Sequence, residues 1–430
     1  MTKIQELILF LGDILALILS FAAMLVIRFG SQYDETVVRL HSGPFGILFA
    51  LWLIIFFVFN LYDFRQVNPN PRNIGRLAIA IGVGIIAGGL LFYLFPYFGI
   101  APKIGLVITG AGAFIFLIIW RRIFYNIFSS FFSRAIVLVG ESPELAHLAR
   151  EIQENPHLGR VIAQIKEDAL EKDPKQITKK VDLIIAEVHA SQKLVTVAQI
   201  LGSNVMTLID AYQEFLGKIP VALMTEEHAL AIASHRESYG YWLIRRLAEN
   251  VIAGLVLLIT SPFLLLAAIA KKIEDGGQII LRPHMRVGKN GKSFHFLKMR
   301  SMIINAEERG VVWAEKRDLR ITKIGHIIRI LHLDEIPQMV NILKGEMALV
   351  GPRPERPEFV EKLEKEIPYY FLRHTIKPGF TGWAQIKFRY ARSVDDSRQK
   401  FEYDLYYIAN RNILLDLGII LKTIQIIFTH

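Results

Sequence analysis

Two adjacent carboxylates and an arginine are the residues whose types and spacing most clearly indicate chemistry in this sequence. Asp334 and Glu335 precede Ile-Pro, and Arg353 lies in a Val-Gly-Pro-Arg-Pro turn whose prolines restrict where its side chain points. An ionised aspartate can act as a nucleophile, and an arginine can hold a phosphate through its planar fork of N–H donors. The group therefore indicates chemistry on a phosphorylated compound.

The apolar spacing after the acidic pair predicts a short helix to position it. Four apolar residues repeat as on one helix face: Ile336, Met339, Val340 and Leu343. The helix is expected to begin just after Asp334 and to end at Gly345. Asp334 would then be the N-cap, where free N–H groups and the helix dipole keep its carboxylate ionised. The simplest alternative is that the pair is only a cap and a first-turn acid.

The whole stretch 331–357 resembles the catalytic segment of the bacterial sugar transferases, the monotopic polyprenyl-phosphate phosphoglycosyl transferases. That family carries Leu-Asp-Glu-Leu-Pro-Gln followed by Gly-Pro-Arg-Pro, and this chain has Leu-Asp-Glu-Ile-Pro-Gln and then Gly-Pro-Arg-Pro. The resemblance implies that Asp334 attacks a nucleotide diphosphate-sugar and that Glu335 helps to hold Mg²⁺. It is nearly continuous from Arg245 onward, and over the first 240 residues it is one of layout only.

The reaction that this resemblance implies moves a sugar-1-phosphate from a UDP-sugar to undecaprenyl phosphate. The products would be UMP and an undecaprenyl-diphosphate-sugar for exopolysaccharide, capsule or O-antigen synthesis. Two anions must meet, so Mg²⁺ and cationic side chains have to cancel their repulsion. A carboxylate nucleophile divides the transfer into two displacements, through a covalent aspartyl-phosphosugar. The identity of the sugar stays open.

Four cationic residues are expected to contact the phosphates of the substrate: Lys298, Arg300, Arg329 and Arg353. Lys298 and Arg300 lie in a Lys-Met-Arg-Ser-Met run that matches a basic segment of the resembled family. Arg329 lies five residues before Asp334. The alternative for each of them is an ordinary solvated surface charge.

Composition favours a membrane protein that acts on anions. The chain has 430 residues, 52% of them hydrophobic, and a formal net charge of +10. Its basic residues are spread out rather than clustered with aromatic residues, so nucleic acid is not an expected partner. Because the chain has no cysteine, disulfides, thiol nucleophiles and cysteine-bound zinc are excluded.

Four long apolar runs open the chain, at residues 7–27, 45–61, 77–98 and 104–120. Each is close to the roughly 20 residues that a helix needs to cross a bilayer. The first run is too long for a signal peptide and contains Asp13, so we expect an uncleaved anchor. Basic residues are concentrated on one side of the bundle: Lys3, Arg65, Arg72, Arg76, Arg121, Arg122 and Arg134. The positive-inside rule therefore places both ends of the bundle in the cytoplasm. The resemblance implies that the membrane is the inner membrane of a bacterium.

Residues 134–235 have the pattern of an α/β domain. Strands are predicted at 135–139 and 181–188, and helices at 143–155 and 192–201, which favours a parallel, Rossmann-like sheet. The glycine fingerprint of dinucleotide binding is missing, because Glu141 follows Gly140 and would repel a pyrophosphate. We expect a structural or regulatory role, as for the degenerate, CoA-binding-like domain of longer members of the resembled family.

Residues 251–270 are apolar enough for a fifth membrane helix, but three features favour a helix that enters and returns. Basic pairs flank both of its ends, at 245–246 and 271–272. A fifth crossing would also place Asp334 outside the cytoplasm, where nucleotide-activated sugars are not expected. Ser261 and Pro262 provide a place to bend, with hydroxyl groups able to cover the freed backbone groups. A Ser-Pro break also resembles the re-entrant helix of the family.

The predicted architecture has three parts: a four-helix transmembrane bundle at 1–125, a Rossmann-like domain at 134–235, and an α/β monotopic catalytic domain at 245–430 with a re-entrant helix at 248–272. The bundle offers surface for a homodimer. Two other functions stay open. One is a nucleotide-sugar oxidoreductase, for which the glycine pattern and a Tyr-x-x-x-Lys pair are missing, and the other is a non-catalytic scaffold of polysaccharide assembly.

Overall fold

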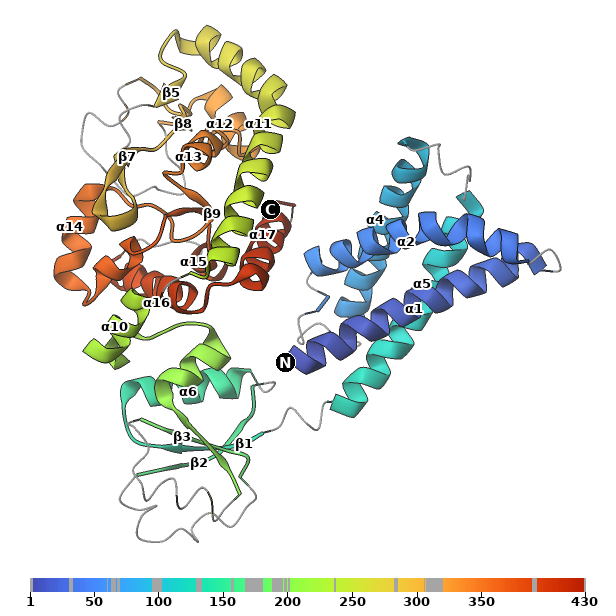
Figure 1. Cartoon of the computed structure of the whole chain (residues 1–430), viewed down its shortest axis with the longest axis horizontal. Coiled ribbons are helices and arrows are strands. Elements are labelled where there is room, and N and C mark those ends of the chain that lie inside the picture. The colour runs from blue at the N-terminus through green and yellow to red at the C-terminus, as the bar shows by residue number, and fades with distance from the viewer. Residues whose placement is uncertain are drawn as a thin grey trace. The chain divides into compact units, whose positions relative to one another are not determined.

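The computed structural model divides the chain into two compact units, Met1–Leu208 (unit 1) and Ile209–His430 (unit 2). Figure 1 shows their helices and strands. The residues that the structure describes are 3–30, 34–59, 61–62, 67, 70–94, 103–128, 134–155, 158–166, 181–187, 196, 199, 202–235, 237–281, 285–304, 306, 320–388 and 393–428.

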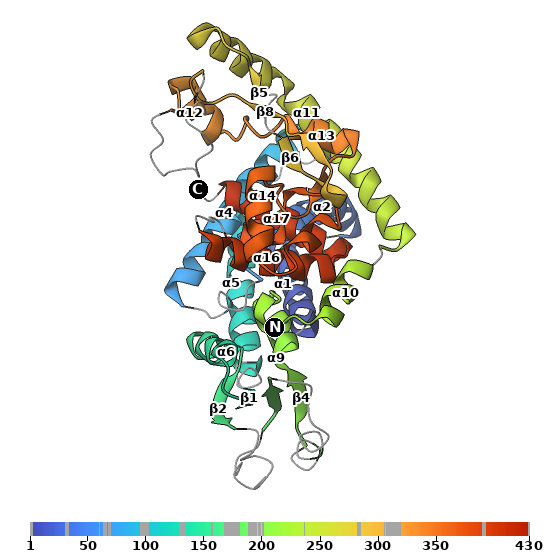
Figure 2. The same cartoon turned by 90° about the vertical axis from the view of Figure 1, so that its left-hand side faces the viewer.

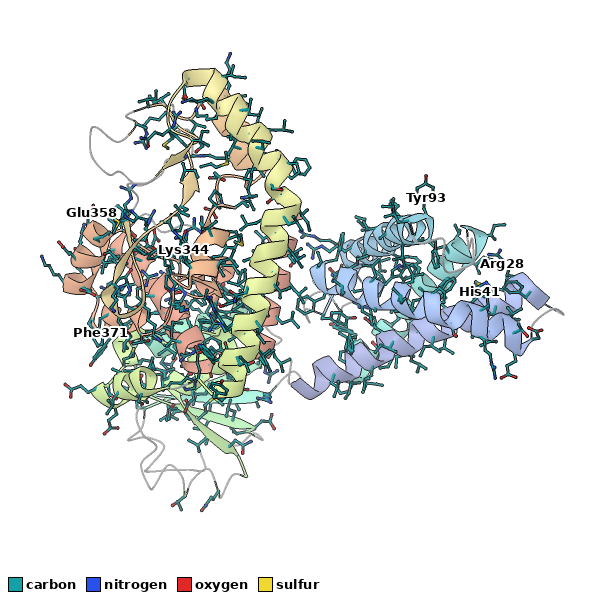
Figure 3. The ribbon with its side chains drawn as sticks, turned by 45° about the horizontal axis from the view of Figure 1, so that its top comes forward. Arg28, His41, Tyr93, Lys344, Glu358 and Phe371 are labelled. Carbon is teal, nitrogen blue, oxygen red and sulfur yellow. The ribbon has the colours of Figure 1, made fainter. Side chains whose placement is uncertain are left out.

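Unit 1 begins with long apolar helices: α1 (Lys3–Phe29), α2 (Glu35–Val58), α4 (Pro71–Leu94) and α5 (Lys103–Phe128). All four are long and apolar enough to cross a membrane, which confirms the prediction of a membrane protein. Figure 3 shows Arg28 and His41 at the same end of the helices, where α1 ends and α2 begins. Residues 95–98, the end of the third predicted run, lie outside the described residues.

A buried ion pair joins α1 to α5. Nη2 of Arg121 lies 2.6 Å from Oδ2 of Asp13, and Nη1 of Arg121 donates to the carbonyl of Leu61 at 2.8 Å. Removing one partner would leave an unpaired charge in an apolar interior, so the pair fixes the register of the two helices. Arg121 therefore lies inside the bundle rather than among the flanking charges that the sequence suggested.

The second part of unit 1 is a parallel sheet with the strand order β2-β1-β3-β4. The strands are β1 (Ala135–Val139), β2 (Arg160–Ile165), β3 (Leu183–Ala186) and β4 (Asn204–Thr207). Helix α6 (Pro143–Glu154) begins at the N-cap Ser142. Of the helix expected at 192–201, only residues 196 and 199 are among the described ones.

Unit 2 contains short strands and mostly short helices. The helices are α9 (Leu208–Ala211, which begins at the unit boundary), η5 (Tyr212–Leu216), η6 (Val221–Leu223), α10 (Glu226–Ser234), α11 (Tyr239–Asp275), η7 (Lys289–Gly291), α12 (Lys323–Ile330), α13 (Gln338–Lys344), α14 (Pro357–Glu366), η8 (Tyr370–His374), α15 (Trp383–Lys387), α16 (Val394–Asn410) and α17 (Ile413–Phe428). The strands pair as β5 (Ile280–Leu281) with β8 (Lys298–Met299), β6 (Met285–Val287) with β7 (Ser293–His295), and β9 (Ala348–Val350) with β10 (Gly379–Thr381).

The main core of unit 2 includes residues that precede the predicted catalytic domain. Ile209 and Val221 pack in one buried cluster with Phe401 and Tyr407 of α16. Trp383 Nε1 also donates to the carbonyl of Gly217 at 2.7 Å. The packing thus favours a boundary near residue 208 rather than 235, while the limits of the domains stay a proposal.

Helix α11 is continuous over 37 residues, with Pro262 inside it. Oγ of Ser261 donates to the carbonyl of Leu258 at 2.8 Å, which is the carbonyl that Pro262 cannot pair. Figure 1 shows that the helix changes direction along its length. Only 6% of its most apolar stretch is buried, compared with 28–39% for the four helices of unit 1. The apolar middle of α11 is therefore open to its surroundings.

Both ends of α11 are held by contacts with other elements of unit 2. Near the beginning, Nη1 of Arg246 donates to the carbonyl of Ile342 in α13 at 2.9 Å. At the far end, Nζ of the fully buried Lys271 donates to Oγ1 of Thr322, the N-cap of α12, at 2.8 Å. Figures 1 and 2 show α13 and α12 lying along the same helix.

Candidate active site

Asp334 lies in the turns that join α12 to α13. His332 takes the left-handed conformation with φ 53°, and the N–H of Leu333 bonds to the carbonyl of Ile328, which closes α12. Helix α13 begins only at Gln338 and has Pro337 as its N-cap. The prediction that Asp334 caps this helix is therefore wrong, because turns closed by hydrogen bonds between residues i and i+3 occupy the positions around and just after the pair Asp334 and Glu335, here called the dyad. The predicted end at Gly345 is confirmed, with φ 81°.

The dyad is held by two cations instead of by a helix terminus. Nζ of Lys298 lies 2.9 Å from Oδ2 of Asp334 and 3.7 Å from Oε1 of Glu335. Nη2 of Arg353 lies 2.5 Å from the same oxygen of Glu335. The side chain of Asp334 is 6% exposed. These four residues form one partly buried group with two negative and two positive charges.

The cations keep the second carboxylate of the dyad ionised. Burial raises the pKa of Glu335, but Arg353 and then Lys298 outweigh that effect and lower the pKa to about 2. Glu335 is thus a carboxylate at any physiological pH. An approaching diphosphate would find both cations already facing the dyad.

A buried network fixes the backbone that carries Arg353. Nη2 of Arg373 donates to the carbonyl of Arg353 at 2.9 Å and to Oδ2 of Asp404 at 3.1 Å. Arg373 is 4% exposed and Asp404 is 1% exposed. Glu355 lies 2.8 Å from Nζ of Lys400, and although burial raises its pKa, Lys400 and then Arg373 lower it to about 2. This network was missed from the sequence, because the residues lie far apart in the chain and no motif links them.

Two of the four predicted phosphate contacts have other partners. Arg300 is 4% exposed, and its guanidinium forms a two-armed ion pair with Asp275 at the end of α11, with Nη1 2.6 Å from Oδ2. Nε of Arg329 donates to Oγ of Ser301 at 2.8 Å. The structure thus brings Lys298 and Arg353 to the dyad, and holds Arg300 in a structural contact between α11 and β8.

A buried amide lies three residues after Glu335, at Gln338. This side chain is fully buried, and within the part of the chain that the structure describes neither its Oε1 nor its Nε2 has a hydrogen-bond partner. An unpaired buried polar group costs about 1–3 kcal/mol, so proteins seldom keep one without a use. Sequence reasoning treated this position as part of a motif and assigned it no role.

The dyad fits Mg²⁺ only as a site completed by a phosphorylated compound. Among the residues that the structure describes, no group of three or more His, Cys, Asp or Glu side chains could hold a metal ion. Mg²⁺ in enzymes is commonly bound by one or two carboxylates together with phosphates and water. The oxygens of Asp334 and Glu335 match that donor set.

Comparison with known proteins places this part of the chain in a family. The family model of the bacterial sugar transferases matches residues 240–430. Over 202 residues the chain is 41% identical to UDP-N-acetylgalactosamine-undecaprenyl-phosphate N-acetylgalactosaminephosphotransferase of Aeromonas hydrophila, covering 47% of this chain and 48% of that protein. It is also 39% identical, over 42% of this chain and 39% of the relative, to UDP-glucose:undecaprenyl-phosphate glucose-1-phosphate transferase of Klebsiella pneumoniae.

A shorter relative is matched over most of its length. The chain is 36% identical to UDP-glucose:undecaprenyl-phosphate glucose-1-phosphate transferase of Caulobacter vibrioides, over 44% of this chain and 70% of that protein. In contrast, the chain spans about half the length of the Aeromonas relative and less than half the length of the Klebsiella relative. The residues that the family model matches, 240–430, include Asp334 and Glu335.

Proposed function

The chain belongs to the bacterial sugar transferase family, and we propose that it transfers a sugar-1-phosphate from a UDP-sugar to undecaprenyl phosphate. The observation that carries this proposal is the grouping of Asp334 and Glu335 with Lys298 and Arg353. The names of the relatives indicate the same classes of donor and acceptor. The product would be the lipid-linked sugar that begins an exopolysaccharide, a capsule or an O-antigen.

The proposed reaction has two displacements at one phosphorus. In the first, a carboxylate oxygen of Asp334 attacks the phosphorus next to the sugar, and the bond from that phosphorus to the bridging oxygen breaks. UMP leaves with that oxygen, and the sugar phosphate stays on Asp334 as an acyl phosphate. In the second, an oxygen of undecaprenyl phosphate attacks the same phosphorus and the carboxylate of Asp334 leaves.

Charge is the main obstacle that the protein has to overcome in both steps. Lys298 and Arg353 now contact the carboxylates of the dyad. When the substrate binds, they can contact its phosphate oxygens in place of those carboxylates. Glu335 would hold Mg²⁺ together with the phosphates of the donor. That ion supplies charge neutralisation on the phosphate oxygens when it is bound.

We also propose that α11 enters the membrane without crossing it, so that the catalytic domain faces the cytoplasm at the inner membrane. Contacts at both ends of the helix with one compact unit support this topology. Cysteines introduced at Gly240 and Gly276 in this cysteine-free chain should both react only with a cytoplasmic reagent. Labelling of the second from outside would refute it.

The parallel sheet of unit 1 is proposed to be a Rossmann-like domain that has lost nucleotide binding. The carboxylate of Glu187 accepts the backbone N–H of Ser142 at the beginning of α6, where such folds bind a pyrophosphate. A Cβ on Gly140 would lie 2.1 Å from Cδ of Glu187, so the side chain already fills the turn. This occupied position counts against the oxidoreductase alternative.

The decisive experiment measures UMP release by the full chain with a panel of UDP-sugars and undecaprenyl phosphate. Asp334→Asn keeps the shape and removes the nucleophile, so release should fall by about a thousandfold or more. Asp395→Asn, on the exposed first turn of α16, is the matched control and should keep the wild-type rate. Without the lipid acceptor, a phosphosugar adduct should accumulate on Asp334 and be detected by mass spectrometry. Near wild-type turnover of Asp334→Asn would refute the two-step reaction.

A further inference from the structure

A second cluster of cations lines a cavity beside the first turns of α11. Arg245, Arg246, Lys289 and Lys377 contribute its positive charges, and the ring of Trp242 forms part of its wall. Arg246 donates to the carbonyls at the C-terminal end of α13, whereas the dyad precedes the N-terminal end. Because a helix of seven residues is about 10 Å long, this cavity is separate from the dyad.

The two carboxylates that also line the cavity are already paired. Oε1 of Glu249 accepts from Nε of Arg245 at 3.1 Å and from the backbone N–H of Leu349 at 3.1 Å. Oε1 of Glu237 accepts from Arg245 at 3.3 Å and from Arg411 at 2.9 Å. The two acids of the cavity thus have cationic partners already, and four cations line it against two acids.

Lys377 is the cation whose surroundings most favour an anion. Its side chain is half-buried, and burial followed by the charge of Arg246 lowers the pKa of the Lys377 ammonium. Among the described residues, neither Lys377 nor the exposed Lys289 forms an ion pair. An anion placed between these cations would relieve their mutual repulsion.

The cavity lies where the surface of α11 changes from aromatic to aliphatic. Tyr239 and Trp242 stack with their ring centroids 5.8 Å apart, and they are 75% and 46% exposed. The next turns expose Val251, Leu255 and Leu258. Exposed aromatic rings beside an exposed aliphatic surface mark the level of lipid headgroups in a bilayer. Phosphate groups are concentrated at that level.

We propose that this cavity binds the phosphate of a membrane phospholipid, with Lys289 and Lys377 on its oxygens and the acyl chains along the exposed face of α11. Arg246 would then connect a bound headgroup to α13. Inorganic phosphate presents the same oxygens as a phospholipid headgroup, so the experiment below distinguishes these two ligands. Lipid binding is measured without turnover and does not depend on the proposed reaction.

The test compares lipid binding by the full chain in detergent micelles, measured by native mass spectrometry. Phosphatidylglycerol and an uncharged diglucosyl-diacylglycerol are titrated separately. Lys289→Gln/Lys377→Gln should weaken phosphatidylglycerol binding by about thirtyfold, and Lys289→Gln alone by about fivefold. The control Lys362→Gln/Lys365→Gln, on the exposed side of α14, should bind like the wild type. Binding of the glycolipid should be weaker and equal in all variants.

Two outcomes would overturn the proposal. Wild-type affinity of both the double and the single lysine variants for phosphatidylglycerol would show that the cavity does not bind its phosphate. Inorganic phosphate that displaces the lipid at an equal concentration would identify a soluble anion as the ligand instead. The single variant replaces an exposed side chain, so it gives a result even where the double variant does not fold.

Discussion

At the carboxyl edge of the sheet in unit 1, Glu187 accepts a hydrogen bond from the backbone N–H of Ser142. In unit 2, by contrast, Asp334 and Glu335 form ion pairs with Lys298 and Arg353. Both places combine acidic side chains with groups that attract anions. In unit 1 the attracting group is a backbone donor that is used up by an internal carboxylate. In unit 2 the attracting groups are two charged, flexible side chains, Lys298 and Arg353. They can exchange a carboxylate oxygen for a phosphate oxygen.

The difference shows what a phosphate site needs beyond a suitable fold. A parallel sheet with a helix N-terminus at its edge is common to many nucleotide-binding proteins. Here the side chain of Glu187, which follows β3, fills the turn after β1, and we propose that it excludes an anion there. The dyad of unit 2 lies on turns between short helices and has no such frame. Its capacity comes from cations that β8 and the turn after β9 bring together.

The largest effect that would sharpen this comparison is expected at Arg353. Arg353→Met removes the cation that faces Glu335, so kcat/KM for UMP release should fall by about a hundredfold or more. Arg300→Lys should keep kcat/KM near the wild-type value and lower the thermal midpoint, because Arg300 pairs with Asp275. Equal losses of activity in both variants would contradict the separation of these two arginines.

The next effect is on the pH dependence of stability. The pKa of Glu335 is about 2 in the folded protein, below its usual value of 4.5. Its ionised form therefore stabilises the fold above pH 4.5, and this contribution, on the order of 2–3 kcal/mol, is lost as the pH falls toward 2.

Thermal unfolding of the full chain in detergent at several pH values between 6 and 3 measures this loss. Glu335→Gln cannot titrate at this position, so its thermal midpoint should fall less steeply with pH than that of the wild type. Parallel curves for the two proteins would contradict the ionic contacts of Glu335 with Arg353 and Lys298.

Some of this could be predicted from the sequence because it depends on local patterns. Long apolar runs predicted the helices of unit 1. The motifs also singled out Lys298 and Arg353 as phosphate contacts, and the structure places both beside the dyad. The N-cap prediction was wrong because the apolar spacing does not say where the first helical hydrogen bond forms. Pro337 sets that position, and α13 begins after it.

Contacts between distant parts of the chain could not be predicted. Arg300 matched a basic motif, yet its partner Asp275 is 25 residues away, at the end of α11. The network of Arg373, Asp404 and Glu355 likewise depends on how η8, α16 and the turn before α14 pack. Burial alone made these charges structural, and burial is a property of the fold.

A smaller effect is expected from Gln338, whose amide is buried without a partner. Gln338→Leu fills a similar volume without polar atoms, so it should raise the stability of unit 2 by about 1–3 kcal/mol. A buried polar group kept at such a cost beside the dyad indicates a use for it, so KM for the UDP-sugar should also rise. Gln385→Leu, which loses an amide that donates to the carbonyl of Phe380 at 3.1 Å, is the control and should destabilise the fold.

The smallest effect is expected where the comparison predicts no chemistry. Glu187→Gln keeps an oxygen that can accept from Ser142 but removes the negative charge near the beginning of α6, which should cost about 0.3–1 kcal/mol. UMP release should be unchanged, because the proposed reaction uses no group of unit 1. The same substitution in unit 2, Glu335→Gln, should lower UMP release by about a hundredfold, since the proposed Mg²⁺ site loses its charge. UMP release and the thermal midpoint are measured for both variants in the same experiment. A large loss of UMP release in Glu187→Gln, with the thermal midpoint of the wild type, would show that unit 1 takes part in the reaction.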